Sequence, residues 1–275
     1  MLRHPRRVEA FGHAKVNIGW QVGARREDGY HDVSGLIQTI SLADRLELVA
    51  DDGEGVRIVV PGHPTLETEA NLVHDAARLL ADHVEAVPVT ITVDKGIPVA
   101  AGLGGGSADA AAALFALNIL WGADLSARRL VELGAEIGSD VPAILVGGLV
   151  HASGRGERVR RIGNTSGYGF VLGISDAHVA TADAYRVFDE LPRTRSDAIE
   201  HNDLEAAAYS LVDGLAGRVD AMREACDVAF VSGSGPTVVG VTADPERAAE
   251  WMRPIFDRVE IAEPTDVGVR VRLGS

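Results

Sequence analysis

The sequence predicts a two-part chain in which an α/β first half is followed by an α+β second half. In the first half, an apolar run at 87–93 with strand character passes through a glycine-rich turn into an alanine- and leucine-rich segment with helix character. In the second half, short apolar runs at 228–231 and 238–241 flank another glycine-rich turn. A polar, glycine-bearing stretch at 154–161 separates the two patterns and predicts a linker or an exposed hairpin.

The elements of the first half follow from local patterns. Apolar and polar residues roughly alternate over 8–23, which predicts a strand or a strand pair. Apolar spacing over 71–83 predicts a helix with Asn71 as its N-cap. A further helix is expected from the glycine-rich turn to about Leu120, and another from Ser126 to about Ile137, closed by Gly138. Short strands are expected at 36–40, 46–49 and 56–60, and the apolar run 143–150 is expected to include one.

The second half predicts a mixture of strands and helices without an internal repeat. Strands are expected at 170–174, at the two runs around the late glycine turn and at 267–273. Helices are expected at 181–191, across 198–225 with a break near Gly214, and at 245–256. We therefore expect two domains, 1–153 and 154–275.

Composition excludes several function classes. The 275 residues carry a formal net charge of −14, which disfavours nucleic acid and anionic membranes as partners. Cys226 is the only cysteine, so no intramolecular disulfide can form. The N-terminus is basic but leads into no apolar leader segment, and no apolar run reaches the length of a membrane span. We expect a cytoplasmic protein with a small-molecule ligand, as a monomer or a homodimer.

The segment from Pro98 to Ala112 predicts an anion site. Four glycines in the five positions from Gly102 to Gly106 remove the Cβ atoms that would keep a ligand from the backbone N–H groups. The helix that follows adds unpaired N–H groups and the positive end of its dipole, which suits phosphate oxygens. Ser107 takes the place of the Walker lysine and of the last dinucleotide-motif glycine, so neither motif is met. The alternative is a turn needed only for close packing of helix and strand.

Two lysines and one aspartate are the candidate reacting groups. Of 26 basic residues only Lys15 and Lys95 are lysine, which suggests positions where a compact ammonium is needed. Phosphoryl transfer needs a group that accepts the proton of the attacking hydroxyl and a cation that compensates charge. Asp140, which follows a helix end and precedes Pro142, is the candidate base, and Lys15 is the cation whose ion pair would keep it ionised. The alternative for Asp140 is a helix cap.

Taken together, these motifs resemble those of the GHMP kinase superfamily. The lysine-bearing N-terminal segment, the loop from Pro98 to Ser107, the Gly138–Pro142 segment and the late loop at 233–235 occur in the order typical of that family. Within it the chain resembles the 4-diphosphocytidyl-2-C-methyl-D-erythritol kinases of non-mevalonate isoprenoid biosynthesis. The segments that carry this finer resemblance are 14–18, 26–31, 71–72 and 201–204, and Asp28-Gly29-Tyr30-His31 is the discriminating one.

The resemblance implies a fold, an activity and two cofactors. The implied fold is an N-terminal ATP-binding domain, with a mixed sheet, helices and a left-handed β-α-β crossover, followed by a C-terminal α+β sandwich. The implied activity is transfer of the γ-phosphate of ATP, with Mg²⁺, to the substrate's 2-hydroxyl, with Lys15 and Asp140 as the catalytic pair. Ser107 would reach phosphate or its Mg²⁺. The implied ATP-binding residues are Asn71, Leu72, Lys95, Pro98, Val99, Ala100, Ala101, Gly102, Leu103, Gly104, Gly105, Gly106, Ser107 and Ala108, with a purely structural salt bridge as the alternative for Lys95.

The resemblance also implies a substrate site for diphosphocytidyl methylerythritol. Tyr30 would stack on the cytosine and His31 would hydrogen-bond it, whereas without the resemblance both would be ordinary turn and surface residues. The remaining implied contacts are Asn17, Thr181 and Tyr185. The chain departs from the family pattern at Trp20, at 34–36, at Ala108 and at Tyr185, where phenylalanine is frequent. The alternatives are a GHMP kinase for another small alcohol, of the homoserine or mevalonate type, and a nucleotide-binding protein without catalysis.

Overall fold

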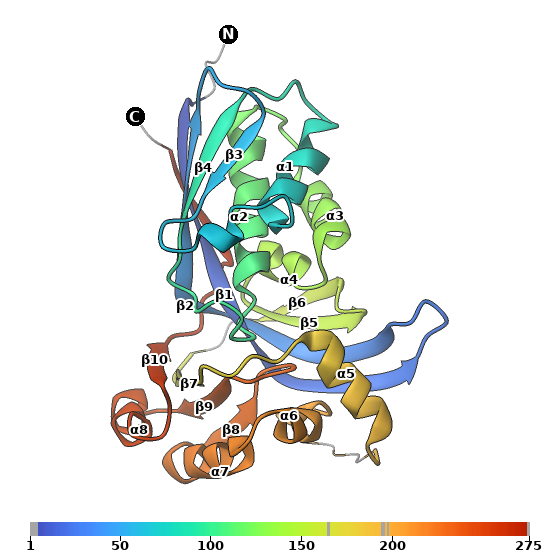
Figure 1. Ribbon diagram of the computed structural model, residues 1–275, viewed down its shortest axis with the longest axis vertical. Coiled ribbons are helices and arrows are strands. Elements are labelled where there is room, and N and C mark those ends of the chain that lie inside the picture. Colours follow the sequence, from blue (N-terminus) through green and yellow to red (C-terminus); the bar gives the residue numbers. More distant parts are fainter. Residues whose placement is uncertain (1–4, 164–165, 194–195, 197, 274–275) are drawn as a thin grey trace.

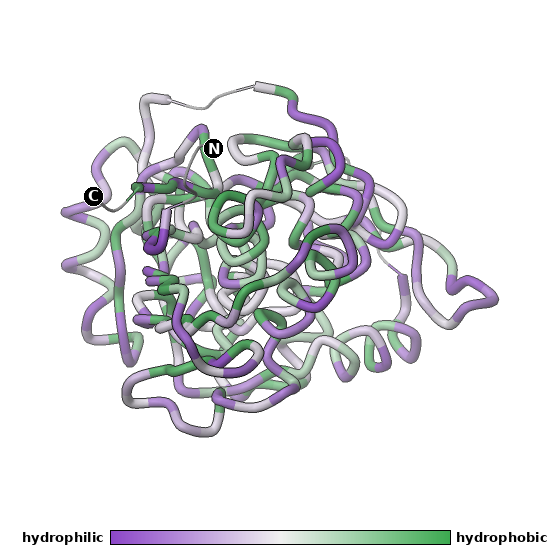
Figure 2. Tube along the Cα trace, turned by 90° about the horizontal axis from the view of Figure 1, so that it is seen from above, coloured by the Kyte–Doolittle hydropathy of each residue, from purple (hydrophilic) through white to green (hydrophobic). Residues whose placement is uncertain are grey.

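The computed structural model describes residues 5–163, 166–193, 196 and 198–273. Figure 1 shows two sheets with their helices, one above the other, and both ends of the described chain near the upper sheet. The long strands β1 (Arg7–Arg25) and β2 (His31–Ala50) run from the upper sheet toward the lower half. The turn that joins them projects outward and is hydrophilic (Figure 2). The two halves of the molecule therefore share one pair of strands.

The first sheet is mixed and holds seven strands within the described part of the chain. Its main path is β11-β1-β2-β4-β3, and β5 (Leu149–Gly154) and β6 (Arg158–Gly163) continue from β2. β3 (Val56–Val59) and β4 (Val89–Asp94) pair in parallel and are connected through α1 (Leu72–Ala81). The other pairings in this sheet are antiparallel, including that of β11 (Val269–Leu273) with β1.

Helices cover one side of this sheet (Figure 1). The most buried is α2 (Gly105–Leu120), whose alanines bring its backbone close to the strands. An added Cβ at Gly12 of β1 would lie 2.3 Å from the Ala108 carbonyl oxygen, so both residues must be small. The outer helices α1 and α3 (Ala127–Ile137) are amphipathic, with Asn71 and Ser126 as N-caps, as the sequence predicts. The short α4 (Val141–Val146) begins just after Asp140.

The second sheet is antiparallel, in the order β10-β7-β9-β8. Its strands are β7 (Gly169–Ile174), β8 (Val228–Val231), β9 (Val238–Thr242) and β10 (Arg258–Ala262). All six residues of β7 are buried, because helices and the first half cover it. The helices of this half are α5 (Thr181–Glu190), α6 (Glu205–Leu211), α7 (Leu215–Ala225) and α8 (Pro245–Met252). The expected α/β half followed by an α+β half is thereby confirmed.

Several predicted elements differ from the structure. The strands predicted at 36–40 and 46–49 form one strand, β2, because Asp44 is a buried polar residue inside it and not a break. The run 143–150 includes the expected strand only at its end, where β5 starts at Leu149; its first half, 143–146, belongs to α4, because Pro142 initiates a helix. Residues 154–161 form the hairpin alternative, and β10 was not predicted. β6 and β11 lie beyond residue 153 yet pair with the first sheet; the division into 1–153 and 154–275 stays a prediction.

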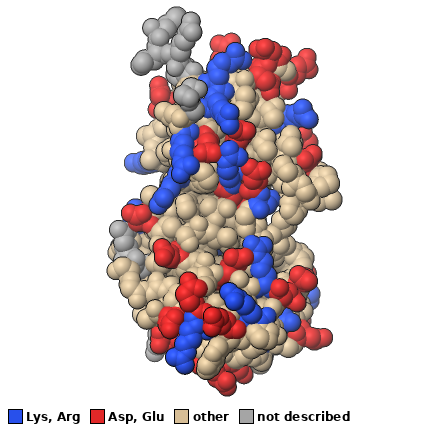
Figure 3. All heavy atoms as spheres, turned by 90° about the vertical axis from the view of Figure 1, so that its left-hand side faces the viewer, with Lys and Arg blue, Asp and Glu red and all other residues tan. Residues whose placement is uncertain are grey.

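Surface charge is mixed on the face shown in Figure 3. Basic and acidic side chains are interspersed in the upper and lower halves, and a band between them carries few charges. Among the described residues, none of the helices combines the length and the hydropathy needed to cross a bilayer.

Candidate active site

The glycine-rich loop connects β4 to α2 by backbone conformations that side chains disfavour. Gly102 and Gly104 have φ of +78° and +74°, and Ala100 adopts φ of +60°. Gly104 is the N-cap of α2 and has no side chain that could bind the helix N–H groups. The loop also packs closely, because an added Cβ at Gly102 would lie 2.6 Å from the Gly235 carbonyl oxygen. The N-terminus of a long helix is thus left open to a ligand, as an anion site requires.

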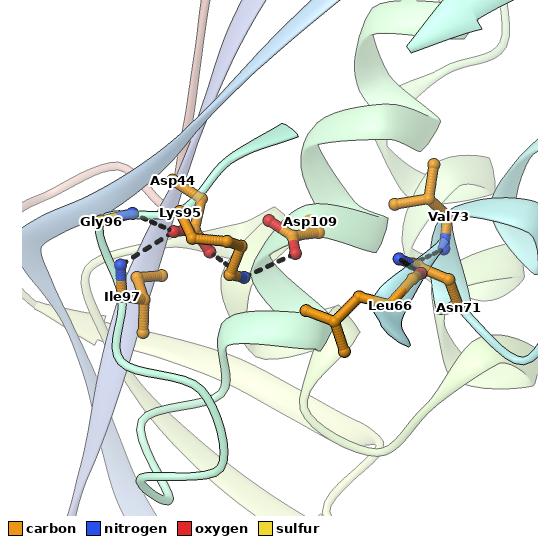
Figure 4. Close-up of polar contacts among 8 residues, drawn as sticks. All are labelled: Asp44, Leu66, Asn71, Val73, Lys95, Gly96, Ile97 and Asp109. Carbon is orange, nitrogen blue, oxygen red and sulfur yellow. Dashed lines mark hydrogen bonds and ion pairs between the residues drawn. The ribbon is translucent and has the colours of Figure 1, made fainter. Parts of the chain in front are cut away.

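A cleft of about 460 Å³ lies over this loop. All the predicted ATP-binding residues line it except Ala108, which is fully buried against β1. The segment before α1 adds lining residues that sequence reasoning missed, namely Thr65, Leu66, Thr68 and Ala70. Asn71 joins this segment to the helix, because its side chain donates to the Leu66 carbonyl at 3.0 Å and accepts from the Val73 N–H at 3.0 Å (Figure 4). The cleft therefore lies between α1 and the glycine-rich loop.

Lys95 sits at the edge of this cleft in a buried ionic cluster with Asp44 and Asp109. Its Nζ lies 2.5 Å from Asp44 Oδ2 and 2.7 Å from Asp109 Oδ2 (Figure 4). The other Asp44 oxygen accepts the N–H groups of Gly96 and Ile97 at 2.7 and 2.8 Å. The cluster thus ties β2, the end of β4 and the first turn of α2 together. Lys95 thus forms the structural salt bridge that was the alternative to a role in ATP binding, and it also lines the cleft.

Protonation of the cluster follows from its burial. Desolvation raises the pKa of the Asp109 carboxyl to about 8, and the Asp44 charge adds to the rise while the Lys95 ammonium opposes it. Burial would lower the pKa of Lys95, but the two carboxylates overcome this and raise it. Asp109 Oδ1 is buried and has no hydrogen-bond partner among the described residues. Burial therefore favours the uncharged form of the Asp109 carboxyl beside the Lys95 ammonium.

Lys15 and Asp140 meet beside the same loop. Lys15 Nζ lies 3.2 Å from Asp140 Oδ2 and donates to Asn17 Oδ1 at 2.5 Å. The stem of Lys15 runs along the loop, since an added Cβ at Gly104 would lie 3.0 Å from Lys15 Cγ. Asp140 occupies the N-cap position of α4, yet its side chain makes no capping hydrogen bond. Its carboxylate is turned to the lysine instead, as a group that acts on a substrate requires.

A second cleft, of about 820 Å³, opens on the other side of this ion pair. All five predicted substrate residues line it: Asn17, Tyr30, His31, Thr181 and Tyr185. Lys15 and Asp140 line it as well, and Ser107 lines both clefts. The structure therefore brings together the predicted nucleotide loop, the predicted catalytic pair and the predicted substrate residues. A hollow of about 400 Å³ near Trp121 contains none of them.

Aromatic and acidic side chains fix the walls of the second cleft. Tyr185 stacks on His31 with ring centroids 5.2 Å apart, and its hydroxyl accepts the Trp20 Nε1–H at 3.0 Å. Burial raises the pKa of Tyr185, an effect that the Trp20 hydrogen bond opposes. His31 is buried and its Nε2 lies 2.9 Å from Asp189 Oδ1, so it is not an ordinary surface histidine.

One contact accounts for two departures from the family pattern. Trp20 pairs with Gly35 across β1 and β2, and an added Cβ at Gly35 would lie 2.5 Å from Trp20 Cε3. The large indole at Trp20 and the missing side chain at Gly35 therefore belong together. The indole in turn needs an acceptor for its N–H, which the hydroxyl of Tyr185 supplies and a phenylalanine could not.

The late glycine loop closes the site from the second half. Asn202 donates to the carbonyls of Val231 and Gly233 at 2.8 and 2.7 Å, so the 201–204 motif holds this loop. The Thr237 hydroxyl donates to the Ala101 carbonyl at 2.6 Å, which joins the two glycine loops directly.

The sequence reasoning also gave no site role to three charged lining residues, Asp109, Arg155 and Asp189, or to Asp44, which is buried behind the first cleft and binds Lys95. A signal existed for Asp189, since it lies four residues after Tyr185 and so faces the same side of α5. Asp44 could not be found from the sequence because its partners lie about fifty residues away.

Comparison with known proteins agrees with this arrangement. The model of the GHMP kinases N terminal domain matches residues 71–148, and that of the GHMP kinases C terminal region matches 189–255. A 4-diphosphocytidyl-2-C-methyl-D-erythritol kinase of Pelotomaculum thermopropionicum is 40% identical over 264 residues, which cover 88% of this chain and 92% of that protein. The chain belongs to the 4-diphosphocytidyl-2-C-methyl-D-erythritol kinase family of GHMP kinases. The sequence-based family assignment is confirmed.

Solved GHMP kinase structures show how much the fold alone can decide. The crystal structure of a 4-(cytidine 5′-diphospho)-2C-methyl-D-erythritol kinase superposes with a TM-score of 0.78 at 31% identity, covering 92% of this chain and 98% of that one. A homoserine kinase from Cytophaga hutchinsonii superposes with a TM-score of 0.79 at 20% identity, covering 97% and 98%. The two folds fit equally well, so the fold by itself does not distinguish the two kinds of kinase, whereas sequence identity does.

Proposed function

We propose that the chain transfers the γ-phosphate of ATP to the 2-hydroxyl of 4-diphosphocytidyl-2-C-methyl-D-erythritol, a step of non-mevalonate isoprenoid biosynthesis. The 40% identical relative, which aligns with this chain over nearly its whole length, is named as this kinase. One observation supports the chemistry above all others. Lys15 touches the glycine-rich loop along its stem and reaches Asp140 with its ammonium, so the phosphate site and the base are a single side chain apart.

The reaction needs few groups beyond these. ATP would lie in the 460 Å³ cleft with its phosphates on the N–H groups of the loop and of the first turn of α2. The substrate hydroxyl would attack the γ-phosphorus while the bond from that phosphorus to the β-phosphate oxygen breaks, and its proton would pass to Asp140. Lys15 would hold the Asp140 carboxylate in place and offset charge on the transferred group.

Mg²⁺ would arrive with ATP and neutralise its phosphate charge. Among the described residues there is no group of three or more His, Cys, Asp or Glu side chains that could form a metal site of their own. A site without such a group suits a cation that takes most of its ligands from phosphates and water. Ser107 is the hydroxyl placed to contribute, because it lines both clefts and no described residue hydrogen-bonds to it.

The base assignment is tested by Asp140→Asn, which keeps the shape and removes the proton acceptor. We expect kcat to fall by about 10² to 10⁴, because general base catalysis contributes a factor of this size, with ATP affinity retained. Turnover is followed by ³¹P NMR, which also shows which hydroxyl is phosphorylated, and ATP binding by calorimetry. Asp213→Asn, an exposed carboxylate outside both clefts, is the matched control and should retain wild-type turnover.

The substrate assignment is tested with the wild-type chain and three alcohols. Turnover of the diphosphocytidyl alcohol, with little of homoserine or mevalonate, is expected. Turnover of homoserine or mevalonate alone would favour the wider family reading. ATP binding without turnover of any alcohol would leave a nucleotide-binding protein. Equal turnover by wild type and Asp140→Asn would remove Asp140 from the mechanism.

A further inference from the structure

Arg155 is a cation of the second cleft to which the proposed reaction gives no role. It lies in the turn between β5 and β6 and lines the cleft together with Lys15 and Tyr30. Its guanidinium carbon is 5.1 Å from the centroid of the Tyr30 ring, which it faces. Its backbone N–H donates to Glu157 Oε2 at 2.6 Å, so the turn that carries it is held from within.

The other cations of this cleft already have partners. Lys15 is paired with Asp140, Arg186 with Asp183 and Glu190, and Arg25 donates its Nε–H to the Gly29 carbonyl. Within the part of the chain that the structure describes, the Arg155 guanidinium has neither an ion pair within 4 Å nor a hydrogen bond. The charge of Arg155 is the smallest of the causes that lower the pKa of Asp28, and Asp28 is itself paired with Arg26 at 3.0 Å. Arg155 therefore offers its full set of donors to a ligand.

The turn that carries Arg155 contacts both ends of the cleft. On one side is Tyr30, the residue expected at the cytosine. On the other side is Gly156, whose added Cβ would lie 3.4 Å from the side chain of Ser139, the neighbour of Asp140. The register sets Gly154 opposite Val33, so the turn starts beside the strand that follows Tyr30. The turn thus reaches from the aromatic ring, where its guanidinium lies, to the neighbour of the reacting carboxylate.

The proposed substrate carries its diphosphate next to the cytidine, between the cytosine and the alcohol. We infer that Arg155 binds the diphosphate of the substrate and so selects nucleoside diphosphate conjugates over uncharged alcohols, an inference that rests on the proposed function. A guanidinium matches phosphate oxygens with paired donors, and its plane is held here by the Tyr30 ring. The cleft thereby compensates the substrate's charge without using Lys15.

Binding of cytidine 5′-diphosphate and of cytidine tests this role directly. Calorimetry on the wild-type chain should give tighter binding of the diphosphate, and Arg155→Ala should weaken it about tenfold or more while cytidine binding changes little. Arg155→Lys should fall between, since it keeps the charge and loses the paired donors. Arg160→Ala removes the same charge from an exposed position on β6 of the same hairpin and should behave as wild type.

Kinetics separate this inference from the proposed function. Arg155→Ala should raise KM for the diphosphocytidyl alcohol by the same factor and leave kcat and KM for ATP nearly unchanged, as for lost ground-state binding. Equal weakening of cytidine and its diphosphate would mean that Arg155 only supports Tyr30, and would overturn the inference. So would wild-type binding that does not distinguish the two ligands. Absence of turnover by the wild type would overturn the proposed function alone, because the binding ratio is measured without catalysis.

Discussion

At the scale of single residues, the two lysines occupy the two positions where this chain buries an ammonium. Lys15 is 5% exposed and faces Asp140 beside the glycine-rich loop. Lys95 lies between Asp44 and Asp109, with its charge stabilised by both carboxylates. In each place the cation lies in a small space beside closely packed glycines. A planar guanidinium would need more room, so the contrast between two lysines and many arginines reflects packing as well as chemistry.

The Asp109 carboxyl should make stability depend on pH. Burial raises its pKa from the ordinary 3.8 to about 8 in the folded chain, so between these limits the folded state holds a proton that the unfolded state has lost. The free energy of unfolding should therefore fall as pH rises from about 4 to about 8, by up to about 1.4 kcal/mol per pH unit, and change little from this cause above pH 8. Asp109→Asn should lack this contribution.

Urea unfolding of wild type and Asp109→Asn at pH 5, 6, 7 and 8 measures this pH-dependent contribution of Asp109 to the free energy of unfolding. Groups outside the cluster of Asp44, Lys95 and Asp109 contribute equally to both chains, so the difference between the two free energies reports the protonation of this cluster. We expect the advantage of the wild type over the variant to shrink steadily across this range. A difference that stays constant with pH would mean that Asp109 does not take up a proton on folding.

At the scale of elements, the glycine-rich loop carries two separate requirements that the sequence shows as one run of glycines. Gly104 needs a positive φ and also space, because Lys15 passes 3.0 Å from where its Cβ would be. Gly106 needs neither: it lies inside α2, and its added Cβ would meet nothing closer than Leu72 Cδ1 at 3.8 Å. The alternative, that the glycines serve only close packing of helix and strand, does not explain why the N-terminus of α2 is left open beside Lys15.

Alanine substitution at these two glycines should therefore have opposite effects on folding. Gly104→Ala should destabilise the ligand-free chain by about 1 to 2 kcal/mol for its left-handed backbone alone and should lower kcat by displacing Lys15. Gly106→Ala should be neutral or stabilise by about 0.5 to 1 kcal/mol, since alanine favours the helix. Urea unfolding without nucleotide gives both free energies. Similar losses for the two variants would contradict the distinction.

At the scale of the whole molecule, the site exists because the two halves bring their glycine loops together. The β1 and β2 strands reach from the first sheet to the second half, where Asn202 forms a bridge with Trp20 and holds the late loop. The Thr237 hydroxyl then donates a hydrogen bond to the Ala101 carbonyl in the glycine-rich loop. Because these links are few and buried, each one should affect both stability and nucleotide binding.

Thr237→Val tests the link between the loops, since it keeps the shape and leaves the Ala101 carbonyl without its partner. We expect a loss of about 1 to 3 kcal/mol in the free energy of unfolding and a raised KM for ATP with a smaller change in kcat. Thr237→Ser keeps the hydroxyl and should retain KM for ATP. An unchanged KM in Thr237→Val would show that the nucleotide loop holds its conformation without help from the second half.

The sequence by itself determined the α/β and α+β character of the two halves, the glycine-rich loop between β4 and α2, the caps at Asn71 and Ser126, and the choice of Lys15 and Asp140 as candidate reacting groups. These depend on local spacing, on glycine's backbone freedom and on the family motifs, all of which are written in short stretches of chain. Only the tertiary structure decided that β2 is continuous through Asp44, that Asp140 faces Lys15 instead of capping α4, and that Arg155 lies over the Tyr30 ring in the second cleft. The physical reason is distance along the chain: a buried charge or an open guanidinium is defined by partners that strand pairing and burial bring from far away, and no local pattern contains them.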